Sequence, residues 1–304
     1  MPTIPQEARE GFTFGCDPEL FVVNSDGKFV TAEGLIEGTK AAPFKVPGGA
    51  YQVDGMAAEF NIDPVSTFKE FNANIEMVMK SLAAALPKGY SLKAVPSVTF
   101  GEEEFSNAPD KAKELGCSPD YNAWTRQVNP PPKDDANPRL RTASGHLHIG
   151  WTSDANLGDA QHVMNCCDLV KQLDWYLGGW SLTVDTDAER RRLYGKAGAL
   201  RFKDYGVEYR VLSNFWITSR ERRLAVWNRM QLAIEAMHKA YLPDKALGYN
   251  DLLIESINTS VMDEKLSERY AYPLTTLAIP PSKYGRMKTA ASSLSAYSLS
   301  MGLE

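Results

Sequence analysis

The sequence predicts an α+β fold whose strands pair mainly in the antiparallel sense. Two tight-turn sequences, Asn24-Ser25-Asp26-Gly27 and Asp54-Gly55, each separate two short runs with strand character, as in β-hairpins. Apolar residues at three- and four-residue steps between 66 and 86 indicate a long amphipathic helix. Strand-like and helix-like segments do not alternate regularly, which disfavours a doubly wound parallel sheet.

The first hundred residues are expected to form mostly strands. We expect these strands at residues 12–16, 20–23, 28–30, 50–53, 57–62 and 90–100. The helix over residues 66–86 would begin with Ser66 as its N-cap and end before Pro87. Its apolar face carries Phe68, Phe71, Ile75, Val78, Met79, Leu82 and Leu86.

Residues 101–141 contain many prolines and little periodicity, so we expect a long loop excursion there. Excursions of this length within a domain often form lids or binding loops. Beyond it we expect strands at 143–151 and 207–212, helices at 159–177, 220–241 and 251–269, and an irregular basic stretch at 188–203. A capping box of Thr218 and Glu221 would open the helix over 220–241. We expect residues 1–304 to form a single domain.

The composition excludes several classes of protein. The chain has 38 acidic and 33 basic residues, a net charge of −5, which weighs against strong non-specific binding to nucleic acid. No apolar run approaches the roughly 20 residues that span a bilayer, and residues 1–11 lack the apolar segment of a signal peptide. We therefore expect no membrane partner and a cytoplasmic location. The sequence does not predict the oligomeric state, and an oligomer is possible.

Four cysteines, Cys16, Cys117, Cys166 and Cys167, are too few and too irregularly spaced for a disulfide framework. We interpret them as reduced thiols. A zinc site at the adjacent pair is the alternative, but the CxxC spacing is absent.

Four short segments place charged or histidine side chains at two-residue spacing on strands, where residues i and i+2 share a face. The first contains Asp17 and Glu19, separated by Pro18. Paired carboxylates suit a hard cation such as Mg²⁺, although a solvated acidic turn would give the same pattern. In the second segment Glu59 and Asn61 share a face, and Glu59 could equally be an exposed strand residue.

The third segment, residues 144–151, is the most informative. His146 and His148 share a face, opposite the apolar Leu147 and Ile149. Imidazole can bind a metal or contact a phosphate, and the alternative is structural burial of both rings. The other two histidines, His162 and His238, stand alone on expected helices and are interpreted as structural or exposed.

The fourth segment pairs Glu208 with Arg210 on one face of a strand. The glutamate can bind a metal, and the arginine offers a planar fork for a carboxylate or phosphate. A cationic stretch precedes it, and it could bind a triphosphate or form a solvated surface. Its members are Arg190, Arg191, Arg192, Lys196, Arg201 and Lys203.

Taken in order, the sequences DPE, EFN, SGHLHIG and EYR in these segments resemble the glutamine synthetase and glutamate-cysteine ligase superfamily. Within it, the chain is most similar to the phage-encoded carboxylate-amine ligases of type 2, over residues 15–216. The resemblance implies a glutamine synthetase catalytic-domain-like fold. In that fold a curved, mainly antiparallel sheet holds ATP and two or three divalent ions on its concave face, and helices pack on the convex face. If the chain is phage-encoded, the cytoplasm would be that of the host.

The resemblance also implies roles for individual residues. The metal ligands would be Asp17, Glu19, Glu59, His146 and Glu208, and the ion would be Mg²⁺ or Mn²⁺. Arg201 and Arg210 would act in catalysis, and Lys203, Arg192, Lys196 and His148 would bind the nucleotide. The family usually has two glutamates at the early acidic pair, so Asp17, with its shorter side chain, departs from the pattern.

The activity implied is ATP-dependent ligation, in which a substrate carboxylate is phosphorylated and an amine then displaces phosphate from the acyl phosphate. The substrates would be a small-molecule or peptide carboxylate and an amine. A metal-dependent hydrolase would use the same histidines and acids without the cationic stretch, and a catalytically inactive interaction protein on the same fold is the third reading.

Overall fold

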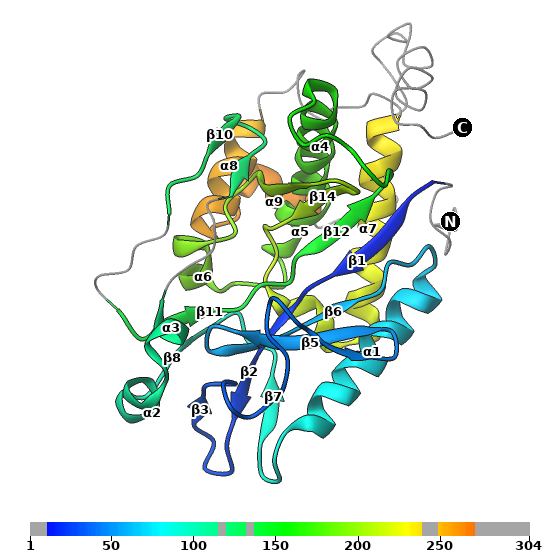
Figure 1. Ribbon diagram of the computed structural model, residues 1–304. Helices are drawn as coiled ribbons and strands as arrows, with labels where there is room; N and C mark the ends of the chain where they lie inside the picture. The colour runs from blue at the N-terminus through cyan, green and yellow to red at the C-terminus, as the bar shows by residue number, and fades with distance from the viewer. Residues whose placement is uncertain (1–10, 115–119, 132–136, 239–248, 271–304) are drawn as a thin grey trace, which may run out of the picture.

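The computed structural model describes residues 11–114, 120–131, 137–238 and 249–270, and its strands confirm the α+β class (Figure 1). All strand pairs between the named strands are antiparallel, as expected. The strands form two larger, curled sheets and one two-stranded sheet. The resemblance had implied a single curved sheet, and the division into two is the main difference.

The first larger sheet carries the histidine strand next to its edge strand β1 (Thr13–Cys16). Its order is β1, β12 (Leu147–Gly150), β14 (Gly206–Tyr209), β13 (Ala199–Lys203), β9 (Tyr121–Asn122) and β10 (Gln127–Val128). β12 is shorter than the strand expected at 143–151. Gly145, which precedes it, lies against the main chain of Ser213, where a side chain would collide with the Ser213 carbonyl oxygen.

The second larger sheet contains both predicted hairpins. Its order is β3 (Phe29–Val30), β2 (Glu19–Val23), β6 (Ala57–Ile62), β5 (Gly49–Asp54) and β4 (Phe44–Val46), and β7 (Ser91–Lys93) also pairs with β2. Gly55, between β5 and β6, has a positive φ of 56°, which explains why glycine stands in this turn. The strand expected at 90–100 is divided, because β8 (Ser97–Thr99) leaves this sheet and pairs with β11 (Leu140–Thr142).

Residues 13–23 join the two sheets, because β1 lies in the first and β2 in the second. Pro18, which has no N–H, stands between them. The neighbouring amides remain paired, since Asp17 N donates to the His146 carbonyl at 3.4 Å and Glu19 N donates to the Ser144 carbonyl at 2.9 Å. The chain therefore passes from one sheet to the other within two residues.

Three long helices pack against the sheets (Figure 1). α1 (Phe68–Ala85) packs on β5 and β6, α4 (Ala160–Leu173) packs on β13 and β14, and α7 (Arg220–His238) contacts both helices. Trp227 on α7 is fully buried, and its ring centroid lies 4.8 Å from that of Phe14 on β1 and 5.5 Å from that of Phe71 on α1. The main core thus lies between the sheets and these helices.

Two predicted N-caps are wrong by one residue, although the helix predicted from residue 220 does begin there. The N-cap of α1 is Thr67, whose Oγ1 accepts from Glu70 N at 3.2 Å, whereas Ser66 Oγ donates to the Phe12 carbonyl. At α7, Arg222 N donates to Ser219 Oγ at 3.2 Å, while Thr218 Oγ1 donates to the Phe215 carbonyl. In both places two adjacent residues, one serine and one threonine, are suitable N-caps. The sequence pattern does not indicate which of the two caps the helix.

The remaining elements correct three expectations. The basic stretch expected to be irregular contains α6 (Ala188–Leu193) followed by β13. The helix expected at 251–269 is interrupted at Ser260, which has a φ of 60°, and forms α8 (Asn250–Thr259) and α9 (Glu264–Tyr270). The helix expected at 159–177 continues α4 with a π-helical turn, η1 (Asp174–Gly178), and α5 (Gly179–Ser181). A 3₁₀ helix, η2 (Asn214–Thr218), precedes α7.

The excursion over residues 101–141 is partly ordered into short elements. Its described part holds α2 (Glu102–Asn107), α3 (Asp110–Lys113), β9, β10 and β11. Such short elements leave no periodic signal in the sequence. Among the described helices, none combines the length and apolar composition needed to span a bilayer.

The aromatic contacts of Trp227 predict a large loss of stability when the ring is removed. We expect Trp227→Ala to lower the free energy of unfolding by about 3–5 kcal/mol, because it leaves a cavity among Phe14, Phe68 and Phe71. Met77→Ala, at a 42% exposed position of α1, is the control and should change it by less than about 0.5 kcal/mol. Urea unfolding followed by circular dichroism measures both, and equal losses would contradict this account of the core.

Candidate functional site

The pairing of three strands brings the predicted polar residues of the first sheet into one row. His148 on β12 is directly opposite Glu208 on β14, and Glu208 is opposite Arg201 on β13. Arg210 lies two residues beyond Glu208, so the two side chains point to the same side of the sheet. Lys203 lies two residues beyond Arg201, and its Nζ is 2.8 Å from Glu208 Oε2. The i and i+2 prediction is confirmed for this sheet.

Asp17, His146 and Glu208 form a first acidic cluster, with one potential ligand atom from each within 4.8 Å of the others. His146 Nδ1 lies 3.4 Å from both Asp17 Oδ1 and Glu208 Oε1. His148 Nε2 lies 3.1 Å from the same Asp17 oxygen. These four residues come from the β1–β2 junction, the start of β12, β12 itself and β14, so the cluster exists only in the folded chain.

The charges of the first cluster offset one another. Burial alone would raise the pKa of Asp17, but the charges and hydrogen bonds of His148 and His146 hold that pKa well below its ordinary value. Burial and the repulsion of Asp17 would raise the pKa of Glu208, but Arg210 and the two histidines bring it down to about 2. Burial and the Arg210 charge lower the pKa of His146, whereas Asp17 overcomes burial and raises that of His148. Both carboxylates are therefore ionised and available as ligands at neutral pH.

Glu19, Asp54 and Glu59 form a second acidic cluster, again with ligand atoms within 4.8 Å. Glu59 on β6 is opposite Glu19 on β2, and Asp54 ends β5. Lys40 Nζ lies 2.7 Å from Asp54 Oδ1, but the lysine side chain is 58% exposed. Burial and the Asp54 charge raise the pKa of Glu19 to about 7, and burial with the charges of Asp17 and Glu19 raises that of Glu59 well above its ordinary value. Cations offset the carboxylates of this cluster only in part, so Glu19 and Glu59 hold their protons more tightly than usual.

The donor atoms of both clusters fit divalent cations that prefer oxygen ligands. The second cluster offers only carboxylates, as Mg²⁺ and Mn²⁺ prefer, and the first adds imidazole, which Mn²⁺ tolerates. Asp17 Oδ1 is buried between two imidazole nitrogens, His148 Nε2 at 3.1 Å and His146 Nδ1 at 3.4 Å, so a cation bound there would share this oxygen with the histidines.

Arg210 connects the first cluster to the excursion. Its guanidinium donates to Glu208 Oε1 and, at 3.0 Å, to His146 Nδ1. Its Nε donates to Asp120 Oδ1 at 2.6 Å, and Arg201 Nε lies 3.8 Å from that oxygen. Arg201, Lys203 and Arg210 therefore form a cationic border beside the ionised acids.

The other members of the cationic stretch do not form one phosphate-binding surface with this border, which corrects that prediction, although Arg190 lines a pocket together with Arg210. Arg190 is buried and donates to the carbonyls of Ala143, Val211 and Leu212, and buried Arg191 donates to Ser181 Oγ. Arg192 is exposed and lies 3.3 Å from Glu189, one helical turn away. Lys196 Nζ donates to the Asn258 carbonyl at the end of α8. A charge run in sequence does not distinguish these environments.

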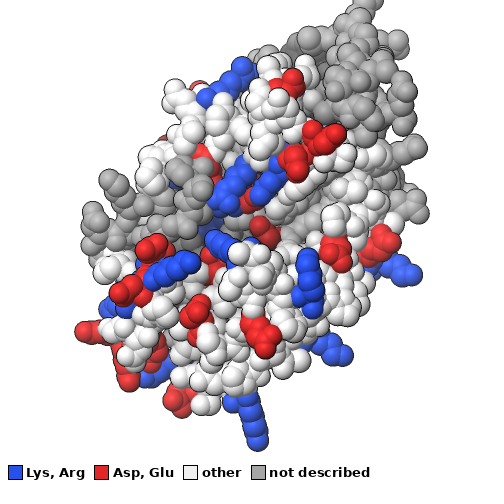
Figure 2. Space-filling model, in the orientation of Figure 1, with Lys and Arg blue, Asp and Glu red and all other residues white. Residues whose placement is uncertain are grey.

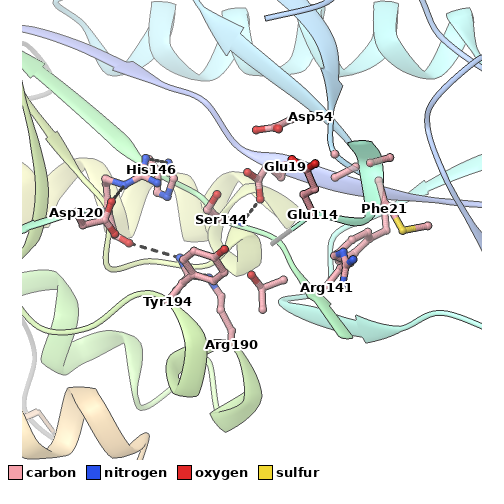
Figure 3. Close-up of a pocket in the computed structure, with 16 residues that line it drawn as sticks. Glu19, Phe21, Asp54, Glu114, Asp120, Arg141, Ser144, His146, Arg190 and Tyr194 are labelled. Carbon is pink, nitrogen blue, oxygen red and sulfur yellow. Dashed lines mark hydrogen bonds and ion pairs between the residues drawn. The ribbon is translucent and has the colours of Figure 1, made fainter. Parts of the chain in front are cut away.

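Two pockets open on either side of the acidic residues. Figure 2 shows basic and acidic side chains together where the middle of this face is hollowed. The first pocket is lined by Glu19, Asp54, Asp120, Ser144, His146 and Arg210, with further residues from the excursion (Figure 3). The second is lined by Asp17, Glu59, His148 and Tyr205, with Gly15 and Gly150. Each cluster contributes to both pockets, so the candidate metal ligands lie between them.

Three residues of the site were not singled out from the sequence. Asp54 was read only as a turn residue, although a carboxylate at a hairpin end next to Glu59 was a detectable signal. Asp120 lies in the excursion, where no pattern marked it. Tyr205 contacts His148 Nδ1 through its hydroxyl, and nothing in the sequence indicated that contact.

The remaining predictions concern histidines and cysteines. His162 is buried on α4, and its Nε2 contacts the Lys203 carbonyl oxygen at 3.0 Å, which agrees with a structural role. Cys16, Cys166 and Cys167 are buried free thiols, as expected, and Cys117 lies outside the described residues.

Residues 144–250 match the family model described as "Phage phiEco32-like COOH.NH2 ligase-type 2". The matched segment contains His146, His148, Glu208 and Arg210. No curated protein matches the sequence. Among solved structures, the fold is similar to a bifunctional glutathione synthetase from Pasteurella multocida, with a TM-score of 0.43 and 11% sequence identity over 98% of this chain. This chain spans about half, 50%, of that protein. The family match supports a relationship with carboxylate-amine ligases.

The raised pKa values of the second cluster predict that cation binding depends on pH. Since the folded pKa of Glu19 is about 7, above its ordinary 4.5, the folded protein retains this proton between these values, and its cation-free stability falls as pH rises through that window. A divalent cation competes with the proton. We therefore expect stabilisation by MgCl₂ or MnCl₂ in thermal unfolding to grow between pH about 5 and about 8.

The control for this experiment is the Glu19→Gln variant, which removes the titrating group. In it the growth of the cation effect with pH should be smaller. Cation stabilisation that is equal at both pH values, or that is unchanged in Glu19→Gln, would contradict a cation site at the second cluster.

Proposed function

We propose that this chain is an ATP-dependent carboxylate-amine ligase that forms an amide through an acyl phosphate. One observation carries the proposal. Two acidic clusters, one ionised beside cationic neighbours and one in which Glu19 and Glu59 hold their protons more tightly than usual, lie side by side between two pockets. A ligase requires this arrangement, because a nucleotide and a second substrate must meet at cations that neutralise the transferred phosphoryl group.

The candidate cation ligands are Asp17, His146 and Glu208 in the first cluster and Glu19, Asp54 and Glu59 in the second. Bound Mg²⁺ or Mn²⁺ would neutralise phosphate oxygens and polarise the bond that breaks. Asp54 is added to the ligands expected from the sequence, because it brings a third carboxylate to the cluster of Glu19 and Glu59.

The cationic border would act on the phosphoryl group itself. Arg210 is fixed by Asp120 on one side and by Glu208 and His146 on the other, so its guanidinium is held in one orientation. A fixed planar donor can stabilise the charge that develops on the phosphoryl oxygens without first reorganising. Arg201 and Lys203 would contact phosphate, and His148, held by Tyr205, would contact phosphate or cation.

The reaction follows from the chemistry of a carboxylate, which resists attack until one oxygen becomes a leaving group. Transfer of the terminal phosphoryl group from ATP to the substrate carboxylate gives an acyl phosphate and ADP. An amine then attacks the acyl carbon, phosphate leaves, and the amine loses a proton. Burial of the ionised acids would keep water from competing with the amine.

The wider assignments rest on the same proposal. We place the chain in the glutamine synthetase and glutamate-cysteine ligase superfamily, as a single domain whose excursion over residues 101–141 contributes to substrate selection. The residues of the excursion that line the first pocket, Ala112, Glu114, Asp120 and Arg141, support that role. Its activity would take place in the cytoplasm, that of the host if the chain is phage-encoded.

The proposal predicts that Glu208 is indispensable. Supplied with Mg·ATP and a panel of carboxylic acids and amines, the wild-type chain should release ADP, and Glu208→Gln should lower that rate by about 100-fold or more, since it removes a charged ligand and the partner of Arg210. A coupled ADP assay measures the rate, and circular dichroism checks the fold.

Glu33→Gln, an exposed acid outside the clusters, is the matched control and should leave the rate unchanged. Thermal unfolding with Mg·ATP separates the alternatives. A metal-dependent hydrolase would turn over without ATP and would not be stabilised by it. Full activity in Glu208→Gln would remove that residue from the proposed site.

A further inference from the structure

Lys40 brings a positive charge to the second acidic cluster from the segment between β3 and β4. Its Nζ lies 2.7 Å from Asp54 Oδ1, and the two side chains are 58% and 23% exposed. Burial lowers the pKa of Lys40, but its hydrogen bond to Asp54 and the charges of all three carboxylates in the cluster raise that pKa overall. The whole cluster therefore acts on this one ammonium group.

The main chain around Lys40 is fixed by hydrogen bonds. Thr39 and Ala42 exchange two backbone hydrogen bonds of 3.1 Å, so Lys40 lies in a tight turn. The turn is attached to β5, because the Gly38 carbonyl accepts from Val53 N at 3.1 Å. Gly38 has a φ of 91°, and a side chain there would collide with the β5 main chain, so the position requires glycine. Val53 is the residue before the paired aspartate, so the turn is anchored next to the cluster.

The side chain of Lys40 is much less constrained than its main chain. Within the described part of the chain, its one ion pair is with Asp54. A lysine ammonium is a strongly hydrated charge on a flexible stem, and an exposed pair of this kind contributes little free energy. Arg210 in the first cluster differs, because Asp120 and His146 both hold its guanidinium. The ammonium of Lys40 can therefore leave the cluster while its backbone stays in place.

A divalent cation and this ammonium would compete for the same oxygens. Ligand atoms of Glu19, Asp54 and Glu59 lie within 4.8 Å of one another, so a cation bound among them would take an oxygen of Asp54. A doubly charged ion at that place would also repel an ammonium group that lies against the same carboxylate. Cation binding and the Lys40–Asp54 contact therefore oppose each other.

We propose that Lys40 is a tethered counter-ion of the second cluster, whose ammonium holds Asp54 in the cation-free chain and moves into solvent when a divalent cation binds. The lysine thereby sets the cation concentration at which the second site fills. This inference rests on the cation ligands of the proposed function, but it requires neither nucleotide nor turnover.

The first test compares Mn²⁺ binding to variants of the full chain by isothermal titration. The titration is run at pH about 8, where most of the Glu19 carboxyl, with its pKa of about 7, has lost its proton. Lys40→Met should tighten binding at one site by about two- to fivefold, the contribution of an exposed ion pair, because the competing ammonium is gone. Lys40→Arg keeps the charge and should not tighten binding.

Lys45→Met is the matched control for the loss of charge. Lys45 is an exposed residue of the neighbouring strand β4, and it makes no ion pair among the residues that the structure describes, so its variant should keep the wild-type affinity. Glu59→Gln identifies the site, because it removes a carboxylate of the second cluster. The affinity that Lys40→Met raises should be the one that Glu59→Gln lowers.

The second test follows the ammonium itself in the wild-type chain. Acetic anhydride acetylates unprotonated amines, and peptide mass spectrometry measures the extent at each lysine. Acetylation of Lys40 should rise by about twofold or more when MnCl₂ or MgCl₂ is added, because the amine leaves the carboxylates that favour its protonated form. Lys45 in the same digest is the internal reference and should not change.

Three results would overturn the proposal. They are a wild-type chain that binds no cation at the second cluster, an Mn²⁺ affinity that is equal or weaker in Lys40→Met, and acetylation of Lys40 that does not respond to the cation. Weaker binding in Lys40→Met would instead make Lys40 a support of the ligands.

The outcome is separable from that of the proposed function. Tighter Mn²⁺ binding in Lys40→Met without ADP release in any mixture would support the counter-ion and refute the ligase. ADP release by a wild-type chain whose Mn²⁺ affinity does not depend on Lys40 would support the ligase and refute the counter-ion.

Discussion

The path of residues 13–23 is the constraint on which the candidate site depends. This segment supplies β1 to one sheet and β2 to the other, and its amides at Asp17 and Glu19 donate to carbonyls of residues 146 and 144. Asp17 and Glu19 are only two residues apart, yet they belong to different clusters, because the sheets diverge at Pro18. The same hydrogen bonds place His146 beside Asp17 and Ser144 beside Glu19. Two adjacent candidate cation sites therefore follow from one crossing of the backbone.

The two clusters differ in electrostatic balance, and the difference has a functional consequence. In the first, Arg210, Lys203 and the histidines offset burial, so its carboxylates are ionised without any added ion. In the second, the exposed Lys40 pairs with Asp54, and burial favours the protonated forms of Glu19 and Glu59. The first cluster is therefore organised before ligands arrive, whereas the second becomes fully ionised only with a cation. Repulsion among the carboxylates of the second cluster would lower the free energy of unfolding without a cation and would be relieved when a cation binds.

The sequence predicted those parts of the site that are set by strand periodicity. Glu59, His146, His148, Glu208 and Arg210 alternate with apolar residues, so a period of two was enough to place each on the polar face of its own strand. The period of two does not predict which strands are neighbours. The division into two sheets could therefore not be predicted from it. Charge alone misled at Arg190 and Arg191, since a buried arginine that pairs with carbonyls has the same sequence signature as an exposed one. Asp120 was missed because it lies in an irregular segment, where position depends on tertiary contacts and not on a repeat.

Those tertiary contacts make the excursion a structural part of the site. Asp120 is bonded to Arg210, and Trp124 Nε1 donates at 2.6 Å to the buried Asp174, which also accepts from Tyr209 on β14. At the far end, Arg141 binds the Lys113 carbonyl and so joins α3 to β11. The strand that carries Glu208 and the segment that lines the pocket therefore share two polar anchors. An occupant that displaces Asp120 would break one of the three side-chain contacts that orient Arg210, which links substrate recognition to the position of the proposed catalytic guanidinium.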